Sequence, residues 1–472
     1  MRAIVYCTDL EPVLRESIAA HIRSHWSETD VYEANNINLS PNADPKALLL
    51  IRGNATSAAE IEAPLKETIV VQRTAAVEEI LFLVDAKLGR LTKSDMVYAK
   101  KEVPRKQAIS RRELFLLPLR RDSPSPSDAP IVNDDSCEAK FGCSKCVDAC
   151  PAPGALKIES NSVTVSSEVC IRCGLCAGVC PVAAIQIPQL SEDAYHGLLT
   201  AMQSSSAPTK TLVITCDERS VAPHPWVVVE EVPGIGVMGV RQLALAANSS
   251  IDAVLVHCAD GLCAAKENAK RASNQIASIL AEHGPIVAYV EGKLDLGKMN
   301  EIHKSAQARD TAFNPTGSAW KDYVKSLETI SRKQAQATGL DLTTMEIADS
   351  CTLCYACVES CPHRALAIHQ DKLDFTSEEC TGCGFCAKIC PEHSITLSQM
   401  VGLIMLSTRT VYKDEMIHCT RCKTPYISVK MFKKVSGMIE GSESVIRLCP
   451  KCRQAEIYEK IFNSPHHQPL EM

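Results

Sequence analysis

The sequence predicts an α+β chain of several domains, and three features support this fold class. Its 472 residues suffice for roughly three or four domains. Residues 1–98 and 205–300 alternate apolar, strand-like runs with helical patterns, which is typical of small α/β domains. Residues 137–190 and 345–400 hold most of the 24 cysteines in short, regular runs, and residues 410–460 hold two further Cys-x2-Cys pairs.

The cysteine pattern and the length of the apolar runs also indicate where in the cell the chain is located. Cysteines in regular runs indicate metal ligands in a reducing compartment rather than a disulfide framework. The N-terminus lacks the apolar core of a signal peptide, and apolar runs such as Met400–Leu406 are too short to span a bilayer. We therefore expect a cytoplasmic chain with no transmembrane segment, which could still sit at the periphery of a membrane complex. The net charge of −6 disfavours nucleic acid as the main partner.

Residues 1–98 predict a small α/β domain with a mainly parallel sheet. We expect strands at Arg2–Cys7, Ala47–Ile51 and Ile69–Gln72, and a helix at Glu11–His25. Cys7 ends the first strand, where α/β domains place ligands, although a buried small hydrophobe is the alternative. No motif indicates what this domain does.

Residues 99–136 predict a basic helix followed by a linker. Residues 100–121 carry eight Lys or Arg and two acids, and Ser110–Glu113 forms a capping-box pattern. A solvated basic helix and a docking site for an acidic partner both remain open. Ser123–Pro130 is rich in serine and proline, as linkers are.

The stretch Cys351–Pro391 contains two copies of the run Cys-x2-Cys-x2-Cys-x3-Cys-Pro, which ligates cubane iron–sulfur clusters. Three cysteines of each run wrap around one cube. The fourth is expected to open a helix, with the proline in its first turn, and to ligate the other cube. A chance cysteine-rich zinc module is the alternative. The predicted ligand sets are Cys351, Cys354, Cys357 and Cys390 for one cluster, and Cys380, Cys383, Cys386 and Cys361 for the other.

Residues 137–181 repeat this pattern with one departure. Five residues rather than two separate Cys137 from Cys143, so the loop between them must bulge if Cys137 ligates. Without Cys137 the site would hold a three-iron cluster or an open iron. Leu156–Val165 alternates around a polar turn and predicts a hairpin. The predicted sets are Cys137, Cys143, Cys146 and Cys180 for one cluster, and Cys170, Cys173, Cys176 and Cys150 for the other.

Both stretches resemble bacterial-type ferredoxins with two 4Fe-4S clusters. The resemblance implies two ferredoxin-like domains, residues 137–190 and 345–400, with four 4Fe-4S clusters in total. Domains of this size cannot bury a large core, so the bound clusters should stabilise the fold by cross-linking its segments.

Residues 205–300 predict a second α/β domain, with strands at Thr211–Cys216, Trp226–Val232 and Ala253–His257 and a helix at Val240–Ala247. Its motifs Val-Pro-Gly-Ile-Gly, Asp-Ala-Val-Leu-Val-His-Cys and Cys-x4-Cys resemble the delta subunit of methyl-viologen-reducing hydrogenases, which also occurs fused to heterodisulfide-reductase-type proteins. The resemblance implies a hydrogenase- or heterodisulfide-reductase-like redox partner.

In that family four cysteines bind a two-iron (2Fe-2S) cluster. Cys216, Cys258 and Cys263 match three of these positions, but Gly234 stands where the family has a cysteine. Three thiolates cannot complete a four-thiolate site. A 2Fe-2S cluster and a cluster-free docking domain therefore both remain open.

Gly234–Gly239 also fits the dinucleotide fingerprint, because it lies between a strand and a helix and Asp260 follows about twenty residues later. Flavin (FAD) or nicotinamide (NAD) binding is thus an alternative. Pro233 and the delta-subunit resemblance compete with it, and a lone match of this kind is weak.

Residues 410–460 predict a zinc ribbon. Four thiolates in two Cys-x2-Cys pairs favour tetrahedral Zn(II), with a rubredoxin-like iron as an alternative. A nucleic-acid-binding ribbon is a third interpretation, for which Lys430, Lys433 and Lys434 are the only local support. A solvated face explains these lysines better. The four predicted ligands are Cys419, Cys422, Cys449 and Cys452.

The function that these patterns favour is that of an electron-transfer subunit. Fully ligated clusters carry electrons but have no open iron for substrate, and the sequence shows no placed nucleophile–base pair and no haem motif. The chain would relay electrons between a donor and an acceptor subunit. The alternatives are a flavin- or nicotinamide-dependent oxidoreductase and an iron–sulfur nucleic-acid factor, the latter disfavoured by the acidic charge balance.

Overall fold

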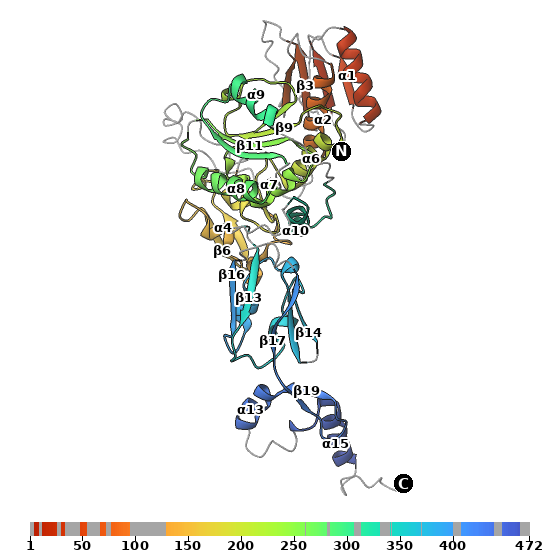
Figure 1. The fold of residues 1–472 in the computed structure, drawn as a ribbon, viewed down its shortest axis with the longest axis vertical. Coiled ribbons are helices and arrows are strands. Elements are labelled where there is room, and N and C mark those ends of the chain that lie inside the picture. Colours follow the sequence, from red (N-terminus) through yellow and green to blue (C-terminus); the bar gives the residue numbers. More distant parts are fainter. Residues whose placement is uncertain are drawn as a thin grey trace, which may run out of the picture. The chain divides into compact units, whose positions relative to one another are not determined.

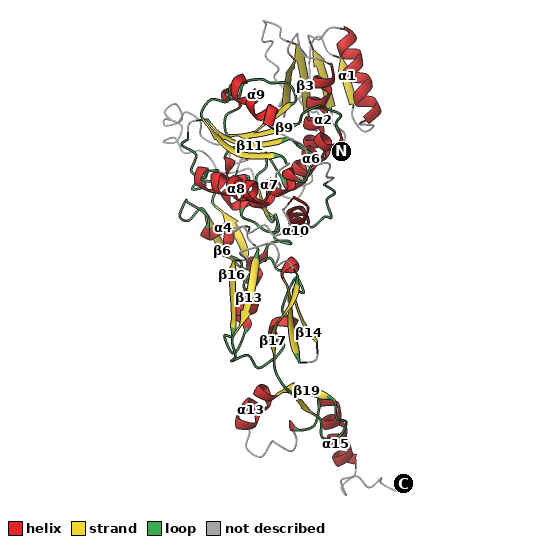
Figure 2. Ribbon diagram, in the orientation of Figure 1, coloured by secondary structure: helices red, strands yellow, loops and turns green. Residues whose placement is uncertain are grey.

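Figure 1 shows the computed structural model of the chain, and Figure 2 shows its helices, strands and loops. The chain divides into two compact units, one of residues 1–140 and 144–337, the other of residues 141–143 and 338–472. The basic segment 100–121, nearly all of the predicted linker and Asp260 lie outside the described residues. The structure describes residues 4–8, 12–25, 30–33, 48–53, 67–71, 77–94, 129–259, 261–280, 284–305, 313–330, 340, 342–369, 371–399, 407–438 and 446–462.

The N-terminal part of the first unit is an α/β domain with a parallel sheet in the order β2-β1-β3-β4. The predicted strands and helix are confirmed within one or two residues, whereas β2 and α2 were not expected. Cys7 lies in β1, but its side chain is outside the described residues. The elements are β1 (Ile4–Thr8), α1 (Pro12–His25), β2 (Asp30–Glu33), β3 (Leu48–Gly53), β4 (Glu67–Val71) and α2 (Val77–Ser94).

The first cysteine-rich module contains only short elements. The predicted hairpin is confirmed as β6 paired with β7, and Ser160 and Asn161 at its turn both have positive φ, as a type I′ turn requires. Strands β5 and β8 pair antiparallel. The elements are β5 (Ile131–Val132), η4 (Glu138–Phe141), α4 (Lys145–Asp148), β6 (Leu156–Glu159), β7 (Ser162–Val165), α5 (Leu175–Gly178) and β8 (Ile185–Gln186).

The second α/β domain has the parallel order β10-β9-β11-β12, so its strand order repeats that of the N-terminal sheet. Strands β9 and β11 are buried along their whole length. The elements are α6 (Glu192–Ser204), β9 (Thr211–Thr215), η5 (Glu218–Ser220), β10 (Val227–Glu231), η6 (Ile235–Val237), α7 (Val240–Ala247), β11 (Ala253–Cys258), α8 (Lys266–Ile279), β12 (Ile286–Glu291), α9 (Leu296–Ser305) and α10 (Ala319–Ile330).

The two α/β domains are joined within the first unit by helix α2. It packs along α6, and Lys87 and Arg90 each lie 2.9 Å from a carboxylate oxygen of Glu230 on β10. Glu230 is only 1% exposed, so these two cations offset the cost of burying its charge.

The second unit contains the other cysteine-rich module and the C-terminal segment. Strand β13 pairs with β16, β15 pairs with β14 and β17, and β18 pairs with β19, all antiparallel. The elements are β13 (Thr343–Ile347), α11 (Ala356–Glu359), β14 (Leu366–His369), β15 (Lys372–Thr376), η7 (Ser377–Glu379), α12 (Phe385–Ile389), β16 (Ile395–Gln399), β17 (Thr408–Lys413), β18 (Met416–His418), β19 (Pro425–Ser428), α13 (Val429–Met438) and α15 (Pro450–Phe462).

Among the described helices, none combines the length and the apolar character that a bilayer crossing requires.

Candidate iron–sulfur and zinc sites

The second cysteine-rich module contains two cavities, each lined by four cysteines. Both cavities are otherwise walled mainly by apolar side chains, such as Leu373 in the first and Phe375 in the second, and both open partly to solvent. Each combines three cysteines of one run with the fourth of the other, so the thiols predicted to share a cluster share a cavity. The first is lined by Cys351, Cys354, Cys357 and Cys390; the second is lined by Cys361, Cys380, Cys383 and Cys386.

The helices of these modules do not begin at the fourth cysteine, so that expectation was wrong. Cys357 lies inside α11 and Cys386 inside α12, whereas Cys361 and Cys390 come just after those helices end. Helices α4 and α5 hold Cys146 and Cys176 in the same way. A proline after each fourth cysteine cannot continue a helix, so it stands beyond the helix end rather than in a first turn.

Three of the fourth cysteines accept a backbone N–H from the residue four positions later. Ala184 donates to Cys180 Sγ at 3.2 Å and Ala365 to Cys361 Sγ at 3.3 Å. Ser394 donates its N–H to Cys390 Sγ at 3.5 Å, and its Oγ lies 3.3 Å away. Burial opposes ionisation of Cys390, but these contacts outweigh it and lower its pKa. Such bonds stabilise a thiolate, and bonds to ligating sulfur set the reduction potential of a cluster.

The central thiols of the two cavities are buried. Burial first, and then the thiolates of the neighbouring cysteines, raise the pKa of Cys357 and of Cys386 to about 12. Cys357 is itself one of the neighbours that act on Cys386, so the two cavities adjoin. A thiol of this kind stays protonated near neutral pH unless a cation displaces its proton, as a cluster iron does. The donor set and the apolar walls fit a thiolate-bound cluster.

Five of the eight cysteines in the first cysteine-rich module pack together at one core. Cys137, Cys176 and Cys180 are buried in a single cluster, and Cys146 and Cys150 pack against it. The longer loop after Cys137 is accommodated as the 3₁₀ turn η4. Cys143 is half-buried and falls in the second unit.

In this module, cysteines of the first half of the motif lie close enough to cysteines of the second half to raise their pKa values. Burial is the main cause of the raised pKa of Cys176, and Cys173, Cys170 and Cys146 raise it further. Burial likewise raises the pKa of Cys173, with Cys150, Cys170 and Cys263 adding to the rise.

The glycine run Gly234–Gly239 does not offer a nucleotide site, because polypeptide covers it. A Cβ on Gly234 would lie 2.5 Å from Cα of Cys173, and one on Gly236 would lie 2.5 Å from the carbonyl oxygen of Cys173. The N–H of Gly236 donates to that same carbonyl at 3.0 Å. A pyrophosphate would need this space and these N–H groups, so the dinucleotide interpretation fails. The glycines instead permit close packing on the cysteine loop.

Cys216, Cys258 and Cys263 lie near one another at the carboxyl edge of the second sheet. Thr215 is opposite His257 in the parallel register of β9 and β11, so the next residues, Cys216 and Cys258, are opposite each other. Burial raises the pKa of Cys216, and Cys258 and Cys263 add to this rise. The position where the resembling family has its fourth cysteine, Gly234, lies on the backbone of Cys173 and leaves no room for a cysteine side chain.

Cys419, Cys422, Cys449 and Cys452 form a compact four-thiol group. Their sulfur atoms all lie within 4.8 Å of one another, and the Cys422 and Cys449 sulfurs are 3.6 Å apart. Zn–S bonds of about 2.3 Å in a tetrahedron place sulfurs about 3.8 Å apart. The group is therefore a four-cysteine site whose size fits a zinc ion.

Two of the three lysines near this site are engaged rather than solvated, which corrects the expectation of a solvated face. Lys430 donates to the backbone oxygen of Asp349 at 2.6 Å and to the hydroxyl of Tyr412 at 2.7 Å. That hydroxyl donates to the carbonyl of Cys351 at 2.9 Å. Lys434 pairs with Glu392, two residues after Cys390, and lowers its pKa. Helix α13 thus holds the loop around the first cavity.

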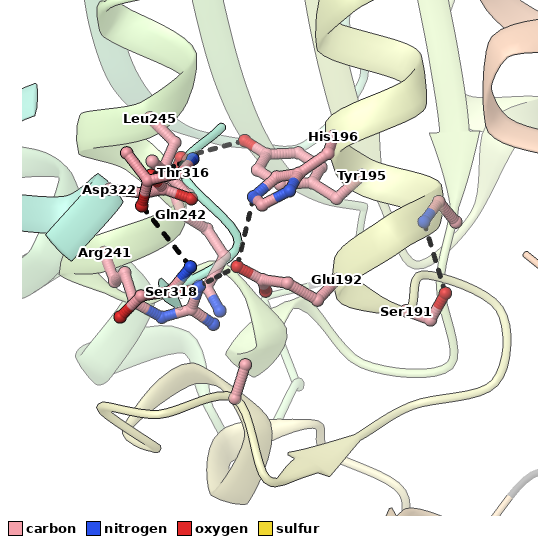
Figure 3. Close-up of polar contacts among 12 residues, drawn as sticks. Ser191, Glu192, Tyr195, His196, Arg241, Gln242, Leu245, Thr316, Ser318 and Asp322 are labelled. Carbon is pink, nitrogen blue, oxygen red and sulfur yellow. Dashed lines mark hydrogen bonds and ion pairs between the residues drawn. The ribbon is translucent and has the colours of Figure 1, made fainter. Parts of the chain in front are cut away.

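A buried polar cluster on α6 and α7 was not anticipated. Figure 3 shows Glu192 between His196 and Arg241, with Tyr195 and Gln242 alongside. Arg241 pairs with Glu192, His196 Nε2 lies 3.3 Å from the same carboxylate oxygen, and Tyr195 donates to the carbonyl of Gln242 at 2.9 Å. The only sequence signal was a single arginine inside the apolar run of α7.

Family models match both cysteine-rich modules. A model described as a 4Fe-4S dicluster domain matches residues 344–391, and two models described as 4Fe-4S binding domains match residues 135–153 and 163–186. The chain therefore carries ferredoxin-type 4Fe-4S domains in both stretches, which are electron-transfer domains.

Two curated proteins are similar to part of the chain. The ABC transporter E family member 1 of Arabidopsis thaliana is 42% identical over 69 residues, which are 13% of this chain and 11% of that protein. A subunit of the ion-translocating oxidoreductase complex of Methanosarcina acetivorans is 33% identical over 69 residues, 15% of this chain and 25% of that protein. The chain thus spans a quarter or less of the length of these relatives.

Proposed function

We propose that this chain, with its ferredoxin-type 4Fe-4S domains, is an electron-transfer subunit that relays electrons through four 4Fe-4S clusters between a donor and an acceptor protein. The observation that carries the proposal is the pair of adjoining cavities, each lined by four thiols drawn from both runs. A cluster whose irons all have thiolate ligands offers no open iron to a substrate, so it gains and loses single electrons.

The ligands that we propose are the four sets predicted from the two doubled runs, and the proposed domains are residues 137–190 and 345–400. In the second domain the adjoining cavities support transfer between neighbouring clusters. In the first, the closeness of Cys150 to Cys173 supports the same crossed arrangement, and the closeness of Cys146 to Cys176 supports two adjoining cluster sites. We assign one structural zinc ion to the four thiols of residues 410–460.

The partner that we propose is a redox protein of the hydrogenase or heterodisulfide-reductase kind. The name of the Methanosarcina relative, a subunit of an oxidoreductase complex, supports membership of such a complex. The second α/β domain is proposed as the docking domain, since its glycine run packs on the Cys173 loop and its Cys263 neighbours Cys173. Whether its three thiols also take part in a 2Fe-2S cluster depends on a fourth ligand from elsewhere. Thiolate chemistry of this kind fits a reducing, cytoplasmic setting.

The exposed apolar residues beside Cys170 mark where electrons would leave or enter the first domain. Ile171 is 54% exposed and Val169 is 43% exposed, one on each side of Cys170. Apolar side chains beside a cluster ligand suit a transient protein contact.

The test is anaerobic reduction of the full chain followed by electron delivery to a one-electron acceptor. We expect uptake of about four electrons per chain, one for each proposed cluster, and their complete return to the acceptor. Ile171→Glu should slow delivery to a protein acceptor, whereas Ile158→Glu, at a similarly exposed site on β6, should not. Uptake of far fewer electrons, or the absorption band of a bound flavin, would contradict the relay.

A further inference from the structure

A buried ion pair lies beside the last thiol of the first ferredoxin-type domain, and the relay described above gives it no role. Arg241 is 5% exposed and pairs with Glu192, whose side chain is 13% exposed. Burial opposes ionisation of Glu192, but the charge of Arg241 and the hydrogen bond from His196 outweigh it and lower the pKa of Glu192 to about 2. Both members of the pair are therefore charged at neutral pH.

Backbone packing brings the segment that carries Arg241, the positive member of the pair, next to the segment that carries Cys180. Gly239, the residue before α7, touches the backbone of Gly178: a Cβ at Gly239 would lie 2.0 Å from the oxygen of Gly178. Cys180 is two residues after Gly178, and Arg241 is two residues after Gly239. The amino end of α7, where helix dipoles are positive, thus abuts the segment that carries Cys180.

The electrostatics of the Cys180 thiol agree with this geometry. Cys180 is 8% exposed, and burial raises its pKa overall, but the charge of Arg241 opposes the rise. A charge acting through a buried, weakly polarisable medium is screened far less than one at the surface.

We propose that Arg241 and Glu192 form a fixed dipole, positive end toward Cys180, which raises the reduction potential of the cluster that Cys180 ligates. This inference rests on the proposed cluster at Cys137, Cys143, Cys146 and Cys180. Reduction adds one electron and hence one negative charge to the cluster, with no proton required, and a nearby cation stabilises that charge. Arg241 is a positioning residue for this electron and does not ligate iron.

The dipole predicts two changes of opposite sign in the reduction potential of the Cys180 cluster. Glu192→Gln removes the negative end, so the potential of the Cys180 cluster should rise. Arg241→Gln added to Glu192→Gln removes the positive end as well, so the potential should fall below that of the single variant. We expect each step to change the reduction equilibrium at least tenfold, which corresponds to about 59 mV for a one-electron couple.

The experiment is an anaerobic redox titration of the cluster-loaded full chain, followed by electron paramagnetic resonance. The signal of the relevant cluster is identified as the one altered by Cys180→Ser. Arg241→Lys, which keeps the charge, should leave the potential nearly unchanged. Glu218→Gln and Arg219→Gln, made at exposed positions of the same unit, are the matched charge controls and should have no effect.

Each outcome decides the proposal. Opposite shifts in one signal, with the other signals constant, support it. If Glu192→Gln keeps its clusters but the reduction potential of the Cys180 cluster does not shift, the dipole proposal is overturned and the relay is left intact. Because this variant only exchanges a carboxylate for an amide, it decides the proposal even if the double variant loses its clusters. Absence of cubane signals from the unmodified chain overturns the relay itself.

Discussion

Gly178 and Gly239 lie back to back: a methyl group on Gly239 would come within 2.0 Å of the carbonyl oxygen of Gly178. Gly178 ends α5, the short helix that contains Cys176, and Gly239 precedes α7. The contact fixes the cysteine loop of the first ferredoxin-type domain against the second α/β domain. These two parts should therefore fold and load their clusters together.

Gly239→Ala should destabilise the first unit, because its added methyl group meets backbone rather than a side chain that can move. Overpacking of this kind costs about 3 kcal/mol or more at its upper end. Thermal unfolding of the loaded protein is the measurement. Gly297→Ala on α9 is the control, since its Cβ would meet only the carboxylate of Asp295 at 3.3 Å. Equal stability of the two variants would contradict the role given to the Gly178–Gly239 contact.

Replacing a fourth cysteine should remove the cluster of the other run. Cys390→Ala should lower the iron content by about four per chain and spare the cluster of Cys380, Cys383 and Cys386. Because Cys354 is assigned to the same cluster as Cys390, the double variant of these two should lose no more iron than either single variant.

Cys383→Ala with Cys390→Ala should, by contrast, lose about eight irons, since these residues serve different clusters. The reverse pattern in the two double variants would show that each run ligates its own cluster.

Lys430 and Lys434 should protect the cluster at the first cavity. Ion pairs that are partly exposed contribute little individually, but both lysines hold the same loop, so their joint replacement by alanine should make opening of the loop more frequent. The measurement is the decay of cluster absorbance in air, which should quicken for one cluster. Lys433→Ala, at an exposed position between them, is the matched control. If all three lysine sites gave the same decay rate, α13 would have no protective role.

Zinc binding at the C-terminal thiols should depend on pH in a defined way. Burial opposes ionisation of Cys419, but backbone N–H groups of Cys422, Cys449 and Arg421 outweigh it and lower its pKa to about 6. Its thiolate is thus present above about pH 6 and is lost as the pH falls through that value. Each zinc should therefore displace one more proton below about pH 6 than above it, and the affinity should fall more steeply there. A plot of log affinity against pH without this change in slope would contradict the assignment.

The cysteine spacing was sufficient to predict which thiols of the second cysteine-rich module share a cavity, because the spacing of a doubled run is a repeated, local pattern. It predicted the grouping of Cys351, Cys354 and Cys357 with Cys390, whose thiols line one cavity. The alternation of apolar and polar residues in β6 and β7 and the apolar runs of β9 and β11 are also patterns of neighbouring residues, and these strands form where expected.

Long-range packing was not predictable in this way. The run Gly234–Gly239 has the spacing of a nucleotide loop, and only the loop at Cys173, about sixty residues before it, shows that its glycines serve close packing. The lysines of α13 looked solvated because their acceptors, Asp349 and Glu392, lie far away in the sequence. Arg241 stood out in the apolar run of α7, but its partner could not be predicted, since Glu192 is on another helix.

The most direct test of the relay is to measure the iron, sulfide and zinc contents of the chain purified without air. Electron paramagnetic resonance of the reduced protein completes the measurement. A four-cluster relay with one zinc site should contain about sixteen irons, about sixteen sulfides and one zinc per chain, with cubane signals from two ferredoxin-type domains. Half as much iron or less, or no cubane signal on reduction, would contradict it.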